Sequence, residues 1–214
     1  MFFDFSRYTV LTEEREYDII KATTFKKVQE MNEREKIDDC ERILFTEEEI
    51  HEQVEKLASW LDKRYEGTVP LAVSVLKGSV IFFCDLVRAM KTPVQMDFMT
   101  ISSYGSGSSS SGLPKIVMDL AANVEGRDIL LVEDIVDSGN TLVKLRNLLN
   151  GRGAKSFTVV TLLDKPSRRQ VDVNADYSCF TVGNEFIVGY GLDYAQQYRN
   201  LPYIGVLKRE IYEK

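Results

Sequence analysis

The chain has 214 residues, of which 44% are hydrophobic and 28% charged, and its formal net charge is -6. This length suits one α/β domain with a sizeable core, or one domain with a small appendage. The negative charge argues against a mainly electrostatic grip on nucleic acid, and no apolar run approaches the length of a membrane span. The composition therefore predicts a globular protein that binds neither nucleic acid nor membranes.

The cysteines and the histidine narrow the chemistry. Cys40, Cys84 and Cys179 lie far apart and form no CxxC pair, which predicts reduced thiols in a cytoplasmic protein. The N-terminal residues also lack the basic flank and clean apolar stretch of a secretory signal. The single histidine, His51, lies in a stretch with helical spacing and is expected to be a solvated helix residue. This argues against a histidine-based triad or a multi-histidine zinc site.

In chain order, residues 1–39 are rich in charge with patchy periodicity and are interpreted as an N-terminal extension without an assigned role. From residue 40 onward, apolar runs and helical spacing alternate. Helices are expected over 46–66, 80–90 and 141–150. Strands are expected over 69–76, 94–101, 115–120, 127–134, 156–163, 177–182 and 186–190. Strand, helix and strand in this order predict an α/β domain with a mainly parallel sheet and right-handed crossovers.

The stretch ILLVEDIVDSGNT, residues 129–141, is the clearest candidate site. An apolar strand ends in Glu133 and Asp134, and the turn 137–141 then leads into the next helix. Backbone N–H groups at a helix N-terminus bind anions, whereas carboxylates suit a sugar diol or Mg²⁺. A phosphorylated ribose has both kinds of group. The alternative is a structural turn whose acids merely favour the helix dipole, but the clustering of three acids with Ser, Gly and Thr favours a site. The phosphate motifs GxxxxGK[ST] and GxGxxG are absent.

Several motifs in order resemble the hypoxanthine-guanine branch of the type I phosphoribosyltransferases, over roughly residues 43–207. They are VLKGS (75–79), SSYGSGSSSSG (102–112), LLVEDIVDSGNTL (130–142), TLLDKPSRR (161–169) and EFIVGYGLDYAQQYRNLPYIGVL (185–207). The resemblance implies a mainly parallel sheet flanked by helices with a small hood subdomain, and a phosphoribosyltransferase domain over residues 40–214. It also implies transfer of ribose 5-phosphate from phosphoribosyl diphosphate (PRPP) to hypoxanthine or guanine, with release of pyrophosphate.

The same resemblance assigns roles in binding PRPP. Glu133 and Asp134 match the positions that hold the ribose hydroxyls, directly or through Mg²⁺, and Asp193 matches a further Mg²⁺ ligand. Asp137 matches the general base or acid for the purine N7 proton. The 5-phosphate site is implied to comprise Asp137, Ser138, Gly139, Asn140 and Thr141. The pyrophosphate site is implied to comprise Leu76, Lys77, Gly78 and Arg199, with an unusual peptide geometry at Leu76–Lys77.

For the base, Lys165 matches the donor to the purine 6-oxo group, Phe186 the stacking aromatic, and Ile187 a backbone contact. This set favours a 6-oxopurine but does not separate hypoxanthine, guanine and xanthine. Glu185 departs from the lysine often found in relatives, which affects the rim of the purine pocket. The segment 102–112 matches a flexible catalytic lid, in which Ser103 and Tyr104 would fold over the pyrophosphate.

Three alternatives stay open on the sequence. One is a regulator of the same fold that senses nucleotides or binds RNA, against which the acidic balance and the presence of both Lys165 and Phe186 argue. Another is a related enzyme that acts on xanthine or a pyrimidine. A Mg²⁺-dependent phosphatase would need a nucleophile arrangement that the sequence does not show. Family likeness further implies a homodimer or homotetramer.

Overall fold

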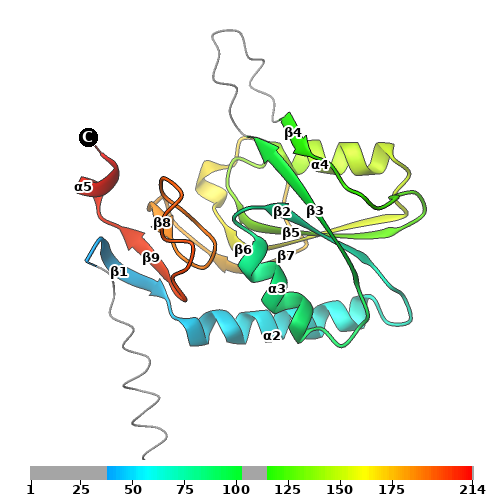
Figure 1. Ribbon diagram of the computed structural model, residues 1–214, viewed down its shortest axis with the longest axis horizontal. Coiled ribbons are helices and arrows are strands. Elements are labelled where there is room, and N and C mark those ends of the chain that lie inside the picture. The colour runs from blue at the N-terminus through cyan, green and yellow to red at the C-terminus, as the bar shows by residue number, and fades with distance from the viewer. Residues whose placement is uncertain (1–37, 103–114, 214) are drawn as a thin grey trace, which may run out of the picture. The chain divides into compact units, whose positions relative to one another are not determined.

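The computed structural model describes residues 38–102 and 115–213. Contacts within the chain divide it between Asp38 and Asp39, and residues 39–214 form one compact unit. The described part of this unit contains a six-stranded sheet and a three-stranded sheet (Figure 1).

The six-stranded sheet has the strand order β4–β3–β2–β5–β6–β7. Its strands are β2 (Leu71–Leu76), β3 (Gln95–Ser102), β4 (Lys115–Met118), β5 (Asp128–Val136), β6 (Ser156–Asp164) and β7 (Tyr177–Thr181). All neighbouring pairs are parallel except β3 with the edge strand β4, which is antiparallel. The predicted mainly parallel sheet is therefore confirmed.

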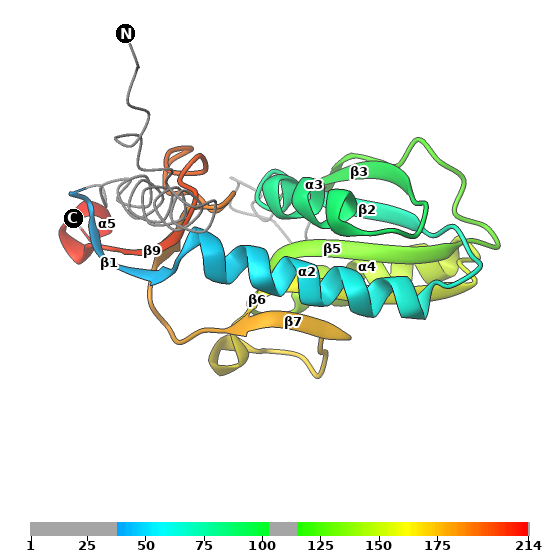
Figure 2. The same ribbon diagram turned by 90° about the horizontal axis from the view of Figure 1, so that it is seen from below.

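Helices cover both faces of this sheet. They are α2 (Glu47–Arg64), α3 (Val80–Ala89) and α4 (Asn140–Gly151). α2 and α3 pack on one face and α4 on the other (Figure 2). Along β2, Ala72 belongs to the core beneath α2 and α3, whereas Leu71 and Val73 belong to the core beneath α4. A strand covered on both faces needs mostly apolar side chains, which explains the long apolar run in the sequence. The polar residue of β2, Ser74, is buried and hydrogen-bonded to the Ser79 hydroxyl at 2.7 Å.

The predicted helix 46–66 is shorter at both ends because capping residues lie outside it. Thr46 is the N-cap: its hydroxyl accepts from the Glu49 N–H at 3.2 Å, and the Glu49 carboxylate accepts from the Thr46 N–H at 2.9 Å. Such a capping box stabilises a helix by about 1 kcal/mol. Tyr65 is the C-cap, and Gly67 then turns the chain with φ +73°.

Two strand ends also differ from the prediction. β5 continues to Val136, beyond the predicted 127–134, because its last residue is still buried at 3% exposure. β4 stops at Met118, short of the predicted 115–120, and it is exposed, with Val117 at 65%. An edge strand without a covered face has little packing to extend it.

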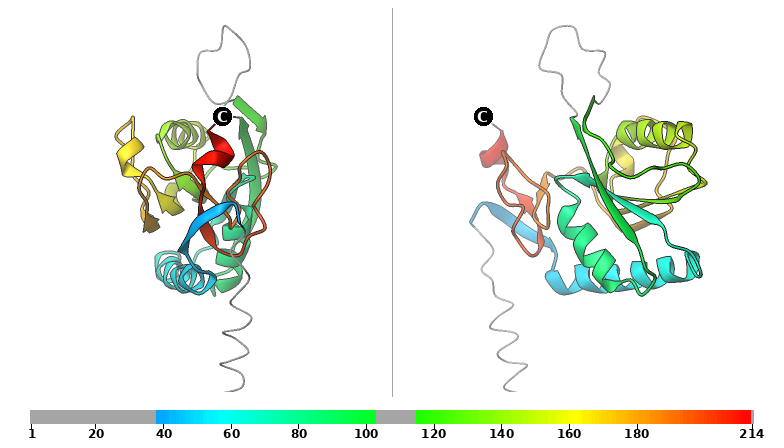
Figure 3. Two further views of the ribbon diagram at one scale, coloured as in Figure 1. Left: turned by 90° about the vertical axis from the view of Figure 1, so that its left-hand side faces the viewer. Right: turned by 45° about the vertical axis from the view of Figure 1, so that its right-hand side comes forward.

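The three-stranded sheet, called the hood sheet here, joins distant parts of the chain. It has the order β1–β9–β8 and consists of β1 (Cys40–Phe45), β8 (Ile187–Val188) and β9 (Ile204–Leu207). Its pairs are antiparallel, with Cys40 opposite Leu207. Figure 3 shows the hood sheet beside the six-stranded sheet. The short helix α5 (Arg209–Tyr212) follows β9.

The predicted strand 186–190 is reduced to the two residues of β8. Gly189 and Tyr190 follow it with φ values of +102° and +47°, which end the extended backbone. The sequence prediction was wrong here because apolar residues continue past the strand into a left-handed loop.

No helix within residues 38–102 and 115–213 is both long and apolar enough to cross a membrane. In the same part of the chain Cys40 is buried, Cys84 exposed and Cys179 partly buried. His51 is exposed on α2 and lies 4.0 Å from Glu55, as expected of a solvated helix histidine.

Candidate active site

The carboxyl end of β5 carries two acids: Glu133 is buried and Asp134 is partly buried. Glu133 is 6% exposed, and its Oε1 has no hydrogen-bond partner among the described residues. Burial, and then the neighbouring Asp134, raises the pKa of Glu133 well above its ordinary value. Burial also raises the pKa of Asp134 to about 6, against the opposing effects of the Ile135 N–H and Arg199. Carboxylates that are costly to ionise favour a ligand that brings a cation or hydroxyl donors.

The turn after β5 leaves a helix N-terminus open. Gly139 is the N-cap of α4, has φ +84°, and supplies no side-chain cap, and the first turn of α4 contains no acid. A Cβ atom on Gly139 would lie 2.6 Å from Cγ1 of Val173, so glycine is required there. The first backbone N–H groups of α4 thus form a dipole-assisted anion site. Because no acid lies in this first turn, the alternative that the acids merely favour the helix dipole has little support.

A second loop approaches the same acids at the end of β2. The Leu76–Lys77 peptide bond is cis. Gly78 packs against Asp134 so closely that a Cβ atom would lie 1.5 Å from Oδ2. Gly191, from the loop after β8, packs in turn on Gly78, where a Cβ atom would lie 2.0 Å from the Gly78 carbonyl oxygen. Three segments distant in sequence therefore meet at this point.

The loop after β8 brings an acid and a guanidinium to this junction. Arg199 Nη2 lies 2.7 Å from Asp193 Oδ1, and Arg199 Nη1 donates to the Gly191 carbonyl at 2.7 Å. The Gln196 N–H donates to Asp193 Oδ2 at 2.9 Å. Lys77 Nζ donates to the Gln196 side chain at 3.2 Å. Two cationic side chains and one acid thus line one side of the site, as a diphosphate with a metal ion would require.

These groups surround one cavity of about 650 Å³. Of the residues predicted from the sequence, it is lined by Leu76, Lys77, Gly78, Glu133, Asp134, Asp137, Ser138, Gly139, Asn140, Thr141, Asp193 and Arg199. Lys165, Phe186 and Ile187 do not line it. Ser103 and Tyr104 lie outside the described residues.

Lys165 lies at the end of β6 and is only 6% exposed. Its Nζ donates to the Glu185 carbonyl at 2.8 Å. Burial lowers the pKa of Lys165, and the nearby Asp137 opposes this effect. The side chain of Glu185 accepts at 2.9 Å from Arg42 Nη2 on β1. The segment before β8 is therefore attached to both sheets.

Phe186 packs within an aromatic group of the hood. Its ring stacks on Tyr212 of α5 at 4.6 Å between centroids and 23° between planes. Tyr194 packs edge-on at 5.6 Å. Ile187 is buried at 7% exposure and pairs with Val206 of β9.

Two arginines that the sequence analysis did not single out position Asp137. The 3₁₀ turn η1 (Pro166–Arg168) follows β6. It places Arg168 Nε 3.1 Å from Asp137 Oδ1. Arg169 donates to the Val136 carbonyl at 3.0 Å and to the Asp137 carbonyl at 2.6 Å, and it forms an ion pair with Asp164. The TLLDKPSRR motif contained both arginines, but nothing in their spacing showed that they contact this turn.

The acids offer oxygen ligands of the kind that a hard divalent cation prefers. Glu133 has an unpartnered oxygen, and the charge of Asp193 contributes to the raised pKa of Asp134. However, within the described part of the chain no three His, Cys, Asp or Glu side chains form a group that could hold a metal ion. Glu133, Asp134 and Asp193 therefore fit a cation that also takes oxygen ligands from a bound substrate, as Mg²⁺ usually does.

Comparison with known proteins agrees with this geometry. The model of the phosphoribosyl transferase domain matches residues 44–195. Hypoxanthine-guanine phosphoribosyltransferase of Bacillus subtilis is 54% identical over 175 residues, which cover 82% of this chain and 97% of that protein. The Streptococcus thermophilus protein of the same name is 52% identical over 176 residues, covering 82% and 98%.

Two further matches are a longer protein and a solved structure. The bifunctional protein TilS/HprT of Listeria monocytogenes is 54% identical over 176 residues, covering 82% of this chain but only 27% of that protein. A crystal structure of hypoxanthine phosphoribosyltransferase from Staphylococcus aureus superimposes with a TM-score of 0.80 at 43% identity, covering 85% of this chain and 100% of that one.

Proposed function

Since the chain belongs to the phosphoribosyltransferase family, we propose that it moves the 5-phosphoribosyl group from PRPP to hypoxanthine or guanine. The products are IMP or GMP and pyrophosphate. One observation carries the proposal: a single cavity joins the buried acids of β5 to the open N-terminus of α4 and to the Leu76–Gly78 loop. A ligand that fills this cavity needs a phosphate, a diol and a second anionic group, and PRPP has all three.

In this function the turn Asp137–Thr141 binds the 5-phosphate through the α4 N-terminus. Glu133 and Asp134 bind the ribose hydroxyls. The Leu76–Gly78 loop and Arg199 bind the pyrophosphate, since a guanidinium pairs strongly with phosphate oxygens. The same acids together with Asp193 would hold Mg²⁺, which neutralises the charge of the diphosphate leaving group when bound.

The purine lies against Lys165 and Phe186 in this proposal. An ammonium has three donors, so Lys165 can keep its bond to the Glu185 carbonyl and still donate to the 6-oxo oxygen. Adenine would present a donor to this donor, and is disfavoured. Phe186 stacks on the base, and Ile187 contacts it through the backbone.

Asp137 is the general base. While the bond from the ribose C1 to the pyrophosphate oxygen breaks and the bond to purine N9 forms, the purine imidazole proton passes to the Asp137 carboxylate. Arg168 and Arg169 position this carboxylate and its backbone. The acids of β5 stabilise the positive charge that develops on the ribose ring.

The proposal extends to organisation. Residues 40–214 are the phosphoribosyltransferase domain, and residues 1–39 are an extension to it. The segment 102–112, with Ser103 and Tyr104, is the lid. The enzyme acts in the cytoplasm as a homodimer or homotetramer.

A direct test is nucleotide formation from PRPP with hypoxanthine, guanine, xanthine and adenine side by side, with pyrophosphate release as a second readout. Hypoxanthine and guanine should react, and adenine should not. A regulator of the same fold would bind PRPP or nucleotides but release no pyrophosphate, and that result would refute the proposal.

The base assignment has its own test. Lys165→Ala should raise the KM for hypoxanthine at least about 10-fold, because a charge-assisted hydrogen bond contributes about 1.5–3 kcal/mol. The KM for PRPP should stay within twofold. Lys155→Ala, which removes a lysine outside the cavity that is 61% exposed, is the control. An equal rise in both KM values for Lys165→Ala would contradict the assignment.

A further inference from the structure

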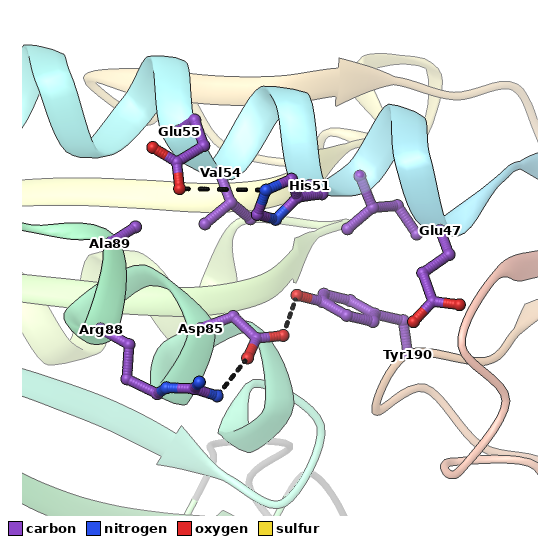
Figure 4. A pocket seen from close by; sticks show the side chains of 9 residues that line it. Glu47, His51, Val54, Glu55, Asp85, Arg88, Ala89 and Tyr190 are labelled. Atoms are coloured by element: carbon purple, nitrogen blue, oxygen red, sulfur yellow. Dashed lines mark hydrogen bonds and ion pairs between the residues drawn. The ribbon is translucent and has the colours of Figure 1, made fainter. Parts of the chain in front are cut away.

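One hydrogen bond links the loop after β8 to helix α3. Tyr190 donates its phenolic O–H to Asp85 Oδ2 at 2.7 Å, and the tyrosine is only 7% exposed (Figure 4). Burial, and then this bond, raises the pKa of Tyr190, so the phenol stays protonated and remains the donor.

Tyr190 has a backbone conformation that few tyrosines adopt. Tyr190 has φ +47° and lies between Gly189 and Gly191, with φ values of +102° and +104°. A bulky residue in the left-handed region is uncommon, and the surrounding structure has to hold it there. Its N–H donates to the Leu201 carbonyl at 2.9 Å, which fixes the backbone but not the ring.

The Tyr190 ring belongs to the core that α2 and α3 cover, and open space also adjoins it. A cavity of about 410 Å³ lies beside it, between α2 and α3. His51 and Glu55 line the cavity from α2, as Asp85 and Arg88 do from α3 (Figure 4). Packing therefore buries the ring, and the hydrogen bond to Asp85 fixes the position of its hydroxyl.

Helix α3, which carries Asp85, starts directly behind the Leu76–Gly78 loop. Ser79 is its N-cap residue, and the Ser79 hydroxyl donates to the Val75 carbonyl at 2.7 Å. The helix and the loop are thus firmly joined. Gly191, the residue after Tyr190, packs on the Gly78 carbonyl. The loop after β8 therefore has two contacts with this joined loop and helix. Gly191 packs on the Leu76–Gly78 loop, and Tyr190 bonds to α3.

We propose that Tyr190 and Asp85 are positioning residues, whose hydrogen bond holds Asp193 and Arg199 in register with the Leu76–Gly78 loop so that a diphosphate group is bound between them. The inference rests on the proposed function, which assigns these two segments to pyrophosphate and its cation. Neither residue lines the cavity of the proposed site. Their effect should fall mainly on the diphosphate end of the site, because the loop after β8 meets the Leu76–Gly78 loop there, whereas Lys165 donates to Glu185 before β8.

Steady-state kinetics can test this role. Tyr190→Phe keeps the ring and removes only the donor, and Asp85→Ala removes the acceptor. Each should raise the KM for PRPP about 5- to 10-fold, since only part of a hydrogen bond to a charged group is transmitted to the site. The KM for hypoxanthine should stay within twofold. Asp85→Asn keeps an acceptor oxygen and should restore nearly normal values.

The double variant Tyr190→Phe, Asp85→Ala should raise the KM for PRPP no more than either single variant does, because both substitutions remove the same bond. Arg88→Ala is the matched control: Arg88 is 83% exposed and 3.7 Å from Asp85, and such a pair contributes little. Additive losses, an equal rise in both KM values, or a KM for PRPP within twofold of wild type in Tyr190→Phe would overturn the proposal.

Failure of the proposed function would look different. In that case the wild-type protein would form no nucleotide from PRPP with any purine. Calorimetric titration with Mg²⁺-pyrophosphate would then decide the positioning role by itself. Weaker binding to Tyr190→Phe than to wild type supports it, and equal or absent binding overturns it.

Discussion

Gly191→Ala is the substitution with the most sharply defined consequence. The added Cβ atom would lie 2.0 Å from the carbonyl oxygen of Gly78, and Cβ atoms essentially never approach within 3.0 Å. The obstacle is backbone on both sides, so no side chain can rotate away. The two segments must separate by about 1 Å. Alanine also has to adopt φ +104°, at a cost of about 1–2 kcal/mol.

This separation should act on both stability and activity. We expect unfolding free energy, measured by urea titration, to fall by at least about 2 kcal/mol through strain and lost packing. A misplacement of about 1 Å at a site can cost on the order of 100-fold in rate, so kcat/KM for PRPP should fall by about that factor. The loss should be larger for PRPP than for hypoxanthine, because the contact lies at the pyrophosphate end.

Substitutions at two other glycines separate the effect of backbone strain from that of the clash with Gly78. Gly126 has φ +70° with nothing within 4 Å of a Cβ atom, so Gly126→Ala carries the strain without the clash and should leave kinetics unchanged. Gly151 ends helix α4 with open space around it, so Gly151→Ala should stabilise the protein by about 0.5–1 kcal/mol. If Gly191→Ala and Gly126→Ala lost equal stability and kept equal kcat/KM, the reasoning from the Gly78 contact would be refuted.

Three further outcomes are expected. Asp137→Asn should lower kcat about 10²–10⁴-fold, because an amide cannot take the purine proton, while PRPP binding measured calorimetrically stays nearly unchanged. Tyr212→Ala should raise the KM for hypoxanthine about 2- to 10-fold without affecting that for PRPP, since an aromatic pair contributes about 0.5–1.5 kcal/mol; no change would show that the stack does not support Phe186. Iodoacetamide should modify the exposed Cys84 well before Cys179, whose pKa is raised by burial to about 12. Mass spectrometry of partly alkylated protein measures this order, and earlier modification of Cys179 would contradict the prediction.

The six-stranded sheet was predictable because its signal is local. Continuous apolar runs marked β2, β5 and β6, and helical spacing marked α2. The hood sheet was not predicted as a whole. Only one residue of β1, Cys40, is fully buried, so the strand has no clear alternation, and β9 is four residues long. Pairing of Cys40 with Leu207 spans most of the domain, and sequence periodicity carries no information on such distant partners.

The candidate site also has one part that the sequence could predict and one part that it could not. Glu133, Asp134 and the turn after them could be placed from the sequence, because a parallel sheet brings the ends of its strands to one edge. The contacts of Lys165 and Arg169 could not, since both donate to backbone carbonyls, and a carbonyl acceptor leaves no trace in residue type. The stack of Tyr212 on Phe186 was equally hidden, because it depends on where a C-terminal helix lies.

The two sheets would bind different parts of the substrate. The ribose and the 5-phosphate would be bound by the end of β5 and the start of α4, within one rigid sheet covered on both faces. The purine would be bound by a segment that the hood holds from outside, through Arg42 on Glu185 and Tyr212 on Phe186. Substitutions in β1 or α5 can therefore shift the purine wall without disturbing the phosphate site. The hood would then influence base preference together with Lys165, which follows β6, whereas the chemistry at the ribose would belong to the six-stranded sheet.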